Sequence, residues 1–354
     1  MEAVQAKLTK KGLNWKDVVT MNVFVTNMDD FGRINAVYKQ FFDINPSPRA
    51  LVGANLNGKA KLQIDLTAIE SIANVKRDTM HVQGISYWAP ANIGPYSQSV
   101  VTQGHAFVAG QIGLVPNTLD LPTPRSFAQE AALSLRNLEN IVSVLELPLK
   151  TNTALCYCFV SDPTYLPLAQ AAWETYMDTP PPTAYIAVPS LPRGAMVEWQ
   201  VLLNAPLPTP FGEEEYDNTT DEEQDEETIR QMKVLQVRED CFETSKTKDI
   251  SCKVLCKSNI TTIVAQLAAD ASKLEEFVSC MDEALKQAKK KWEQVLSIRA
   301  LYNESANMTN TVCSSLLTAE VLKHSKTVPT ITSIPVNAIG SLGNQVVVCA
   351  LHVL

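Results

Sequence analysis

The sequence predicts an α+β fold made of a repeated small domain, in which a mixed sheet carries two helices on one face. Three observations predict it. One pattern occurs twice, at residues 19–64 and 154–199, with a fixed offset of 135 residues. Each copy alternates β-rich runs with stretches whose apolar residues recur every three or four positions. The offset exceeds the roughly 20–50 residues of solenoid repeats, so it indicates duplication of a whole domain.

Length and composition limit the number of domains and the class of protein. A chain of 354 residues has room for two or three domains. Hydrophobic residues make up 45% of it, which is ordinary for proteins that bury a core. The formal net charge of −8 argues against a nucleic-acid partner. The sequence shows no signal peptide and no apolar run of about twenty residues, so we expect a cytoplasmic protein without a membrane partner.

Residues 1–72 are predicted to be a first, truncated domain that starts inside its first helix. Gly12 is a natural end for that helix. A second helix follows a turn at residues 27–30, because its apolar residues have helical spacing. The expected elements are a helix at 2–11, a strand at 17–26, a helix at 31–42, and strands at 50–54 and 61–69.

Residues 80–206 are predicted to be a complete second domain. It has the order strands, helix, strand, helix, strands, which gives a mixed sheet with both helices on one face. The expected strands are 82–88, 98–101, 105–114, 155–160, 184–188 and 196–204, and the expected helices are 126–145 and 166–177.

An acidic linker is predicted at residues 207–228. Its segment 213–227 carries ten Asp or Glu and no basic residue. Such a run is most simply a solvated, disordered connection, and a docking tail for a basic partner is the alternative.

Residues 229–354 are predicted to be a third, divergent copy. The segment 260–267 resembles 105–112, and a long helix at 274–293, a strand at 296–302 and a helix at 311–323 follow in the same order. Residues 329–332 and 345–353 then match 182–185 and 196–204. The alternative is an extension of unrelated origin.

The eight cysteines do not form a metal-binding pattern. Cys156 and Cys158 alternate in an apolar strand and so share one face. Cys252 and Cys256 are too far apart for a CxxC pair, and no second pair follows. We expect all eight to be reduced thiols that pack as small hydrophobic residues, with no metal site.

The repeated segments resemble the RidA/YjgF family. In the second copy the resemblance rests on the runs IGPYSQ at 93–98 and VAGQIG at 108–113, followed by Leu191-Pro192 and Val197-Glu198. The first copy adds Asp30-Phe31, Asn35, Tyr38 and Phe41, and Pro48-Arg49. The resemblance implies a chorismate-mutase-like fold. It also implies homotrimers whose clefts between subunits hydrolyse imines and enamines to carbonyl compounds and ammonia.

The same resemblance implies which residues do that chemistry. An arginine clamps the substrate carboxylate and a glutamate positions the attacking water, while the tyrosine of GPY and the backbone at AGQ line the cleft. The first copy keeps the arginine as Arg49 but has Gln63 in the glutamate position. The second copy keeps the glutamate as Glu198, together with Tyr96 and Gly110, but has Thr183 in the arginine position.

The third copy is expected to have Thr330 and Val346 in these two places. No single copy holds the pair, which argues against the family's deamination. Structural interpretations also stay open. Tyr96 is then a packing residue, Arg49 forms a surface ion pair, and Glu198 faces outward from an alternating strand.

Tandem divergent copies followed by an acidic linker and a further copy resemble the C-terminal region of eukaryotic diphthine–ammonia ligases. That resemblance implies amidation of diphthine on translation elongation factor two, with ATP used by an N-terminal pyrophosphatase domain. We find no SGGKDS-like loop here, and the turn at 340–343 lacks the lysine of a phosphate loop. We therefore expect no cofactor in this chain, and a fragment or partial gene product.

Three functions remain open from the sequence. The first is a non-catalytic accessory region of the ligase, which the split residue pairs favour. The second is a stand-alone imine deaminase, which becomes stronger if Arg49 and Glu198 meet in a cleft between copies. The third is a scaffold in which three copies of one chain reproduce the family's trimer. The expected partners are accordingly elongation factor two, and RidA-like domains of the same chain or of a homo-oligomer.

Overall fold

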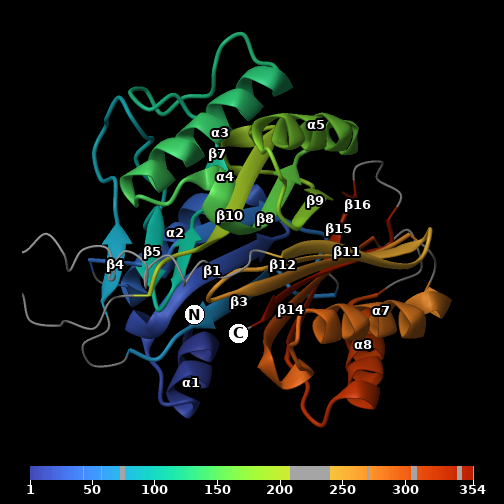
Figure 1. The fold of residues 1–354 in the computed structure, drawn as a ribbon. Helices are drawn as coiled ribbons and strands as arrows, with labels where there is room; N and C mark the ends of the chain where they lie inside the picture. Colours follow the sequence, from blue (N-terminus) through green and yellow to red (C-terminus); the bar gives the residue numbers. More distant parts are fainter. Residues whose placement is uncertain are drawn as a thin grey trace, which may run out of the picture.

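The computed structural model describes residues 1–42, 44–56, 58–71, 76–207, 240–268, 271–303, 309–340 and 345–353. These residues form three sheets with helices packed against them (Figure 1). We call the parts that contribute most of each sheet the first unit (residues 2–68), the second unit (77–204) and the third unit (240–353). The acidic run at 213–227 and the turn at 341–343 lie outside the described residues.

The second unit contains most of an eight-stranded sheet with the path β16-β9-β8-β10-β6-β5-β4, to which β7 is attached through β10. Its two long helices, α3 and α5, contact strands β7 to β10 and cover one face of the sheet (Figure 1). The elements are β4 Arg77–Met80, β5 Ser99–Thr102, β6 His105–Val108, β7 Gln111–Ile112, α3 Phe127–Val144, α4 Leu149–Asn152, β8 Thr153–Val160, α5 Leu166–Tyr176, β9 Thr183–Ala187 and β10 Val197–Asn204.

The third unit forms a six-stranded sheet with the order β11-β12-β13-β17-β14-β15. Helices α7 and α8 contact each other and one face of this sheet. The elements are β11 Asp240–Thr247, β12 Ile250–Cys256, β13 Thr261–Leu267, α7 Leu274–Gln287, β14 Val295–Asn303, α8 Asn310–His324, β15 Thr330–Val336, β16 Ala338–Ile339 and β17 Val347–Val353. The short β16 leaves its own unit and pairs with β9 of the second unit.

The first unit forms a three-stranded sheet with the order β2-β1-β3. Helix α1 ends where Gly12 takes a positive φ of 74°, as a C-terminal glycine does. The elements are α1 Glu2–Lys10, β1 Val18–Val25, α2 Phe31–Tyr38, β2 Arg49–Gly53 and β3 Leu62–Ala68.

The three sheets share one topology. In the second unit β8 pairs in parallel with β9 and antiparallel with β10, and in the third unit β14 pairs in the same way with β15 and β17. In the first unit β1 makes the same pairings with β2 and β3. The predicted α+β fold with repeated RidA-like domains is therefore confirmed. The residue limits assigned to the domains stay a prediction.

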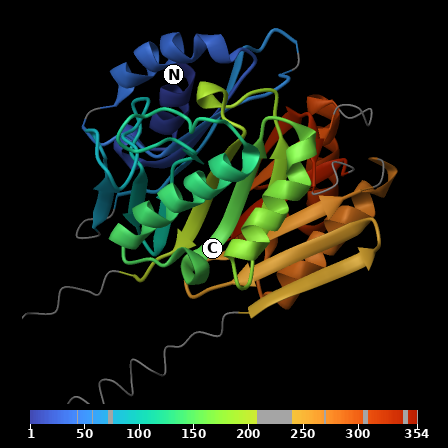
Figure 2. The ribbon, with the colours of Figure 1, turned by 90° about the horizontal axis from the view of Figure 1, so that it is seen from above.

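Buried apolar residues form separate cores and one shared core. Each unit has its own cluster between sheet and helices. A further cluster, which we call the shared core, takes residues from all three units, including Phe24, Phe159 and Leu301. The sheets therefore face one another through their inner sides, while the helices lie on the outside (Figure 2). Because hydrophobic burial drives association, this inner contact holds the units together.

Some predicted elements were wrong in position. The strand expected at 82–88 lies instead at Arg77–Met80, where β4 pairs with β5. The segment after it forms a loop, in which the Val82 N–H donates to the side chain of Gln98 rather than to a strand. The hairpin of β11 and β12 was not predicted, because its first strand is mostly polar. Helix α7 also ends at Gln287, short of the predicted 293.

The eight cysteines all lie in the described residues, and none of them is paired in a disulfide there. Cys156 and Cys158 share the helix-facing core of the second unit. Cys241 is exposed, so the expectation that all eight pack as hydrophobic residues was wrong there. No helix among the described residues has the length and apolar character needed to cross a bilayer.

Candidate active site

A small cavity lies where the first and second units meet. It has a volume of about 20 Å³, which is room for one water-sized molecule. The first unit contributes its β2 strand and α2 helix, and the second unit contributes its 93–112 segment and β10. The lining residues are Phe31, Arg49, Leu51, Ile93, Tyr96, Gly110, Ile112, Pro192 and Glu198.

Arg49 is held in a fixed position in this cavity. It is the first residue of β2, and its side chain reaches toward helix α2. Asn35 and Tyr38 lie on the same face of that helix, three residues apart. The Arg49 Nη2 donates to Asn35 Oδ1 over 2.8 Å, and the guanidinium lies 4.6 Å from the Tyr38 ring centre and 5.5 Å from that of Tyr96. The surface ion pair proposed for Arg49 is therefore wrong, since the residue is 3% exposed.

Two glycines allow the charged groups to enter. A Cβ on Gly110 would lie 1.8 Å from Glu198 Oε1, and a Cβ on Gly94 would lie 2.7 Å from Arg49 Nη2. Both distances are shorter than real contacts. The Gly110 N–H also donates to the Arg49 carbonyl oxygen over 3.2 Å, which ties the two units together at the cavity. The glycines of the GPY and AGQ runs therefore provide space for the guanidinium and the carboxyl group.

Glu198 is buried on β10, opposite Phe159 of β8. Its neighbours Val197 and Trp199 face the helices, so Glu198 points to the inner side of the sheet. Burial raises its pKa to about 8, and the positive charge of Arg49 lowers the pKa by a smaller amount. The expected alternative of an ordinary outward-facing residue is wrong, because the side chain is 2% exposed.

Two buried polar atoms of this cavity have no partner in the protein. They are Arg49 Nη1 and Glu198 Oε2. Leaving a buried donor or acceptor unpaired is costly, so each atom favours a water or ligand group beside it. Burial lowers the pKa of the Arg49 guanidinium, yet this group stays protonated at any working pH. The cavity thus offers a fixed cation and a carboxyl group that can gain or lose a proton near neutral pH.

The strand pairings identify the equivalent positions in the other units. The equivalent strands β1, β8 and β14 each have a register shift at their start, after Val18, Thr153 and Val295 respectively. In each strand, the residue three positions after the one that precedes the shift pairs with the parallel neighbouring strand. Its partner there is Arg49 in the first unit, Thr183 in the second and Ile331 in the third. The residue six positions after the one that precedes the shift pairs with the antiparallel neighbouring strand. Its partner there is Gln63 in the first unit, Glu198 in the second and Val348 in the third.

This register confirms the equivalence of Arg49 with Thr183 and of Gln63 with Glu198. It corrects the third unit, where Ile331 and Val348 occupy the two places rather than Thr330 and Val346. The error arose because alignment by a shared Pro-Thr pair places Thr330 where the pairing of β14 with β15 places Ile331. Neither Ile331 nor Val348 carries a group for acid–base chemistry.

A second cleft lies between the second and third units. Thr183 takes the place of the arginine there, and its hydroxyl accepts a hydrogen bond from the Trp173 indole N–H at 3.1 Å. The cavity is about 180 Å³ and is lined by twelve residues of both units. They are Gln170, Glu174, Pro180, Pro181, Thr183, Tyr185, Glu243, Ser251, Cys252, Lys253, Val264 and Gln266.

The third contact lies between the third and first units. Gln63 does not face an arginine there. Its Nε2 donates to the Ser333 carbonyl oxygen over 3.3 Å, so the amide joins the two units. Of the six candidate residues, the structure therefore brings Arg49, Tyr96, Gly110 and Glu198 into one cavity, and places Thr183 and Gln63 at two other contacts.

Considered unit by unit, the split pairs argue against the family's chemistry, but in one cleft the two residues line the same cavity, because two units complete the pair. Sequence reasoning missed Asn35 and Gly94 as site residues. Both stand in runs that carried the family resemblance, so the signal was present. The sequence runs did not indicate what Asn35 and Gly94 do, because both act through their contacts with Arg49.

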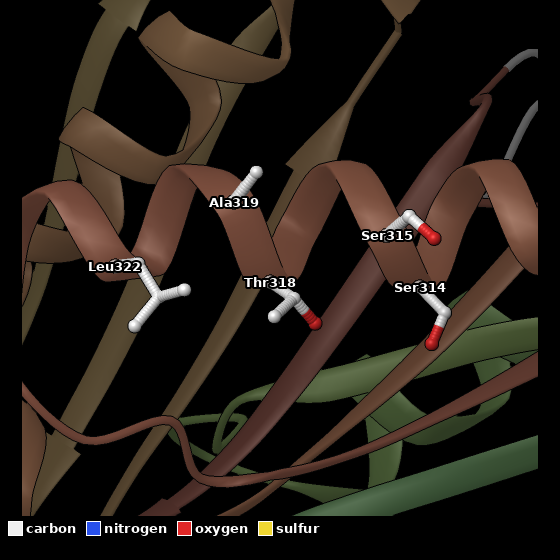
Figure 3. A pocket seen from close by; sticks show the side chains of 5 residues that line it. All are labelled: Ser314, Ser315, Thr318, Ala319 and Leu322. Atoms are coloured by element: carbon white, nitrogen blue, oxygen red, sulfur yellow. The ribbon is translucent and has the colours of Figure 1, made fainter.

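Other hollows and clusters offer less chemistry. A shallow groove on the exposed face of α8 is lined by small side chains and one leucine, none of which titrates (Figure 3). Within the described residues, no group of three or more His, Cys, Asp or Glu side chains is arranged to hold a metal ion. The cleft between the first two units is therefore the best candidate for catalysis.

The comparisons with known proteins concern mainly the first and second units. The family model described as endoribonuclease L-PSP matches residues 1–70 and 87–203. A diphthine–ammonia ligase of Schizosaccharomyces pombe is 34% identical over 197 residues, which are 54% of this chain and 31% of that protein. The chain thus spans about a third of that relative's length.

A 2-iminobutanoate/2-iminopropanoate deaminase of Mus musculus is 31% identical over 115 residues, covering 32% of this chain and 84% of that protein. The crystal structure of the YjgF gene product from Escherichia coli is 27% identical, with a TM-score of 0.32, and the match covers 36% of this chain and 98% of that chain.

Proposed function

The chain belongs to the endoribonuclease L-PSP family, and we propose that it is the RidA-like region of a diphthine–ammonia ligase that hydrolyses small imino acids where its first two units meet. The observation that carries the catalytic part is the shared cavity of Arg49 and Glu198, each with one unpartnered buried atom. The resemblance to the ligases supports the wider assignment.

The cavity suits a substrate with a carboxylate beside a C=N bond. The Arg49 guanidinium forms two hydrogen bonds with a carboxylate in fork geometry. Asn35 and the two tyrosine rings fix the orientation of the guanidinium before the substrate binds. Binding therefore costs little conformational entropy of the Arg49 side chain. The remaining walls are apolar, from Phe31, Leu51 and their neighbours, and would contact a short hydrocarbon side chain once the cleft widens beyond its present volume of about 20 Å³.

Glu198 can move the protons that hydrolysis requires. With a pKa of about 8 it is mostly neutral at pH 7 and can donate its proton to the imine nitrogen. The resulting carboxylate takes a proton from the water that attacks the carbon, which gives a carbinolamine. Return of that proton to the nitrogen, with loss of the hydroxyl proton, breaks the C–N bond and releases a ketone and ammonia. Imine and water are consumed, and no cofactor is needed.

Kinetics with 2-iminopropanoate, formed in place from alanine by an amino acid oxidase, test the proposal. Glu198→Gln should lower kcat by about 10²–10⁴-fold, the usual contribution of a general acid–base. Arg49→Ala should raise KM because the carboxylate loses its clamp. Glu174→Gln is the matched control, since it makes the same change in the second cleft. Wild-type chain that does not accelerate ketone release, or Glu198→Gln with full activity, would refute the catalytic part.

A scaffold without catalysis is the second candidate. The small volume of the first cleft, about 20 Å³, and the lack of a second Arg/Glu pair favour it. Titration calorimetry with pyruvate, the product ketone, separates the two candidates. Binding that Arg49→Ala abolishes supports the active cleft, whereas no binding and no turnover support the scaffold.

The wider assignment adds a partner and a use for the ammonia. The ligase relatives are named for joining diphthine to ammonia. A deaminase cleft in this chain would release ammonia beside the enzyme that consumes ammonia. Translation elongation factor two is the proposed protein partner, ATP belongs to the pyrophosphatase domain of such ligases, and the cytoplasm is the proposed compartment. Co-purification of elongation factor two with the tagged chain tests the partner, and its absence at saturating concentration would count against it.

A further inference from the structure

A charged cluster lies in the shared core, and we call it the inner polar cluster: Asn22, Asp65, Tyr157 and Arg299. Arg299 donates from Nε to Asp65 Oδ2 and from Nη2 to Asp65 Oδ1, each over 2.8 Å. Its guanidinium also lies 4.5 Å from the centre of the Tyr157 ring. Asn22 Nδ2 donates to Asp65 Oδ1 over 2.8 Å. The side chains of Arg299 and Asp65 are 14% and 13% exposed, so this ion pair is largely removed from water.

All three units contribute to this cluster from the same place in the fold. Asn22, Tyr157 and Arg299 each stand four residues after the first residue of the register shift in β1, β8 and β14. Asp65 lies opposite Asn22 on β3, whereas the equivalent residues opposite Tyr157 and Arg299 are Gln200 and Ala350. One structural position therefore carries an amide, an aromatic ring and a cation in the three units.

We propose that the inner polar cluster selects one copy of each unit around the shared core and so makes the three units of one chain assemble with one another. The apolar residues of the shared core cannot do this alone, because hydrophobic burial is not directional and the three inner faces are alike. Arg299 has both its carboxylate and its aromatic partner only when the first and second units occupy the other two places.

The wrong arrangements carry a penalty. Three third units from three chains would bring three Arg299 guanidinium groups together, and like charges at close range disfavour association. A third unit beside two second units would leave the Arg299 charge without a carboxylate. Discrimination of this kind, by buried polar groups that fit one arrangement, is the best-attested role of such groups.

The order of the units also decides what forms in the clefts. In the observed order Arg49 of the first unit faces Glu198 of the second unit. With the order reversed, Arg49 would face the third unit, whose equivalent residue is Val348. By admitting one copy of each unit, the inner polar cluster supplies both the first unit and the second unit that a complete Arg/Glu pair requires, although it does not line that cavity. The inference does not depend on the proposed activity.

The decisive test replaces the ion pair by apolar residues of similar size in the full chain. Asp65→Leu combined with Arg299→Met should stay folded, because well-packed apolar residues often replace a buried ion pair without loss of stability. In this variant the units should no longer discriminate between units of the same chain and units of another chain. Sedimentation velocity should therefore show dimers and larger species that increase with concentration. Wild type should stay monomeric. Asp30→Leu with Arg33→Met, at an exposed ion pair, is the matched control and should also stay monomeric.

Two further variants keep the test decisive. Arg299→Met alone leaves Asp65 buried and unpaired, so its melting temperature should fall by about 5 °C or more. Arg299→Lys keeps the charge but loses the two-pronged geometry, and should give fewer large species than the double variant. A double variant or lysine variant that is strictly monomeric at every concentration would overturn the proposal. So would an unchanged melting temperature for Arg299→Met, or a wild-type chain that forms a stable homotrimer.

Discussion

The two clefts on either side of the second unit are built on the same backbone pairings and differ in their chemistry. At the first cleft Arg49 and Glu198 line a cavity of about 20 Å³. At the second, Thr183 is bonded to Trp173, Val348 replaces the glutamate, and the cavity is about 180 Å³. Because each cleft takes one key residue from each of two units, a site is lost when either contributor changes. A complete pair can equally persist when no single unit holds it.

Gly110 leaves the space that the Glu198 carboxyl group occupies. Gly110 lies four residues after Ala106, and Ala265 lies four residues after Thr261, which occupies the same place in the third sheet. The Ala265 side chain lies opposite Cys349 in the helix-facing core of the third unit, so a Cβ there meets no glutamate. At Gly110 it would strike the Glu198 carboxyl group.

The largest expected effect concerns the free energy of unfolding as a function of pH. The pKa of Glu198 is raised from 4.5 to about 8 in the folded protein. Below pH 4.5 both states hold the proton. As pH rises toward 8, the unfolded state ionises while the folded state stays protonated, so wild type loses stability. Glu198→Gln should avoid this loss and exceed wild type by on the order of 4 kcal/mol at pH 9.

Denaturant unfolding of both proteins at pH 4, 6, 8 and 9 measures this difference. The gap should open between pH 4.5 and 8 and stay constant above 8. A gap that is the same at all four values would show that Glu198 does not carry a raised pKa. Glu174→Gln, an exposed carboxyl group of the second cleft, is the control and should follow wild type.

The next effect is on catalysis. Gly110→Ala should lower kcat/KM for 2-iminopropanoate by about 100-fold, close to 3 kcal/mol, because the added methyl group displaces the Glu198 carboxyl group. The measurement is the same ketone-release assay. Ala265→Gly, the matched change in the third unit, should leave kcat/KM within twofold of wild type. Equal losses in both variants would mean that the activity does not depend on this cleft.

A smaller effect separates structural from catalytic roles of equivalent residues. Trp173→Phe removes the N–H donor to Thr183 and should cost about 1 kcal/mol of unfolding free energy without lowering deamination. Tyr38→Phe, at the equivalent place beside Arg49, keeps the ring under the guanidinium and should also retain activity. Loss of activity in Trp173→Phe would show that the second cleft takes part in the reaction.

The smallest effect is expected at the third contact. Gln63→Ala removes one hydrogen bond to the Ser333 carbonyl oxygen and should cost about 0.5–1 kcal/mol of unfolding free energy, with unchanged deamination. Thermal unfolding monitored by circular dichroism measures it. A fall in activity would contradict the assignment of catalysis to the Arg49/Glu198 cleft alone.

Much of the fold could be predicted because it depends on local patterns. Helices α2, α3 and α5 and strands β8 and β10 follow from apolar spacing and turn residues. The β11–β12 hairpin could not be found in this way. Its first strand is largely polar, and it forms because β12 and β13 offer an edge for pairing. The strand misplaced at 82–88 failed because only Val82 of its apolar residues enters the second unit's core, while Ile85, Tyr87 and Trp88 are exposed on a loop.

The sequence by itself determined which groups were available for chemistry: one arginine, one glutamate, a tyrosine and a glycine in runs that resemble a known family. Only the tertiary structure decided that they meet. Arg49 and Glu198 are 149 residues apart and lie in different units, so no local pattern couples them. Their approach depends on long-range burial of three inner sheet faces and on the order in which the units pack. The raised pKa of Glu198 has the same origin, because desolvation exists only after the units have come together.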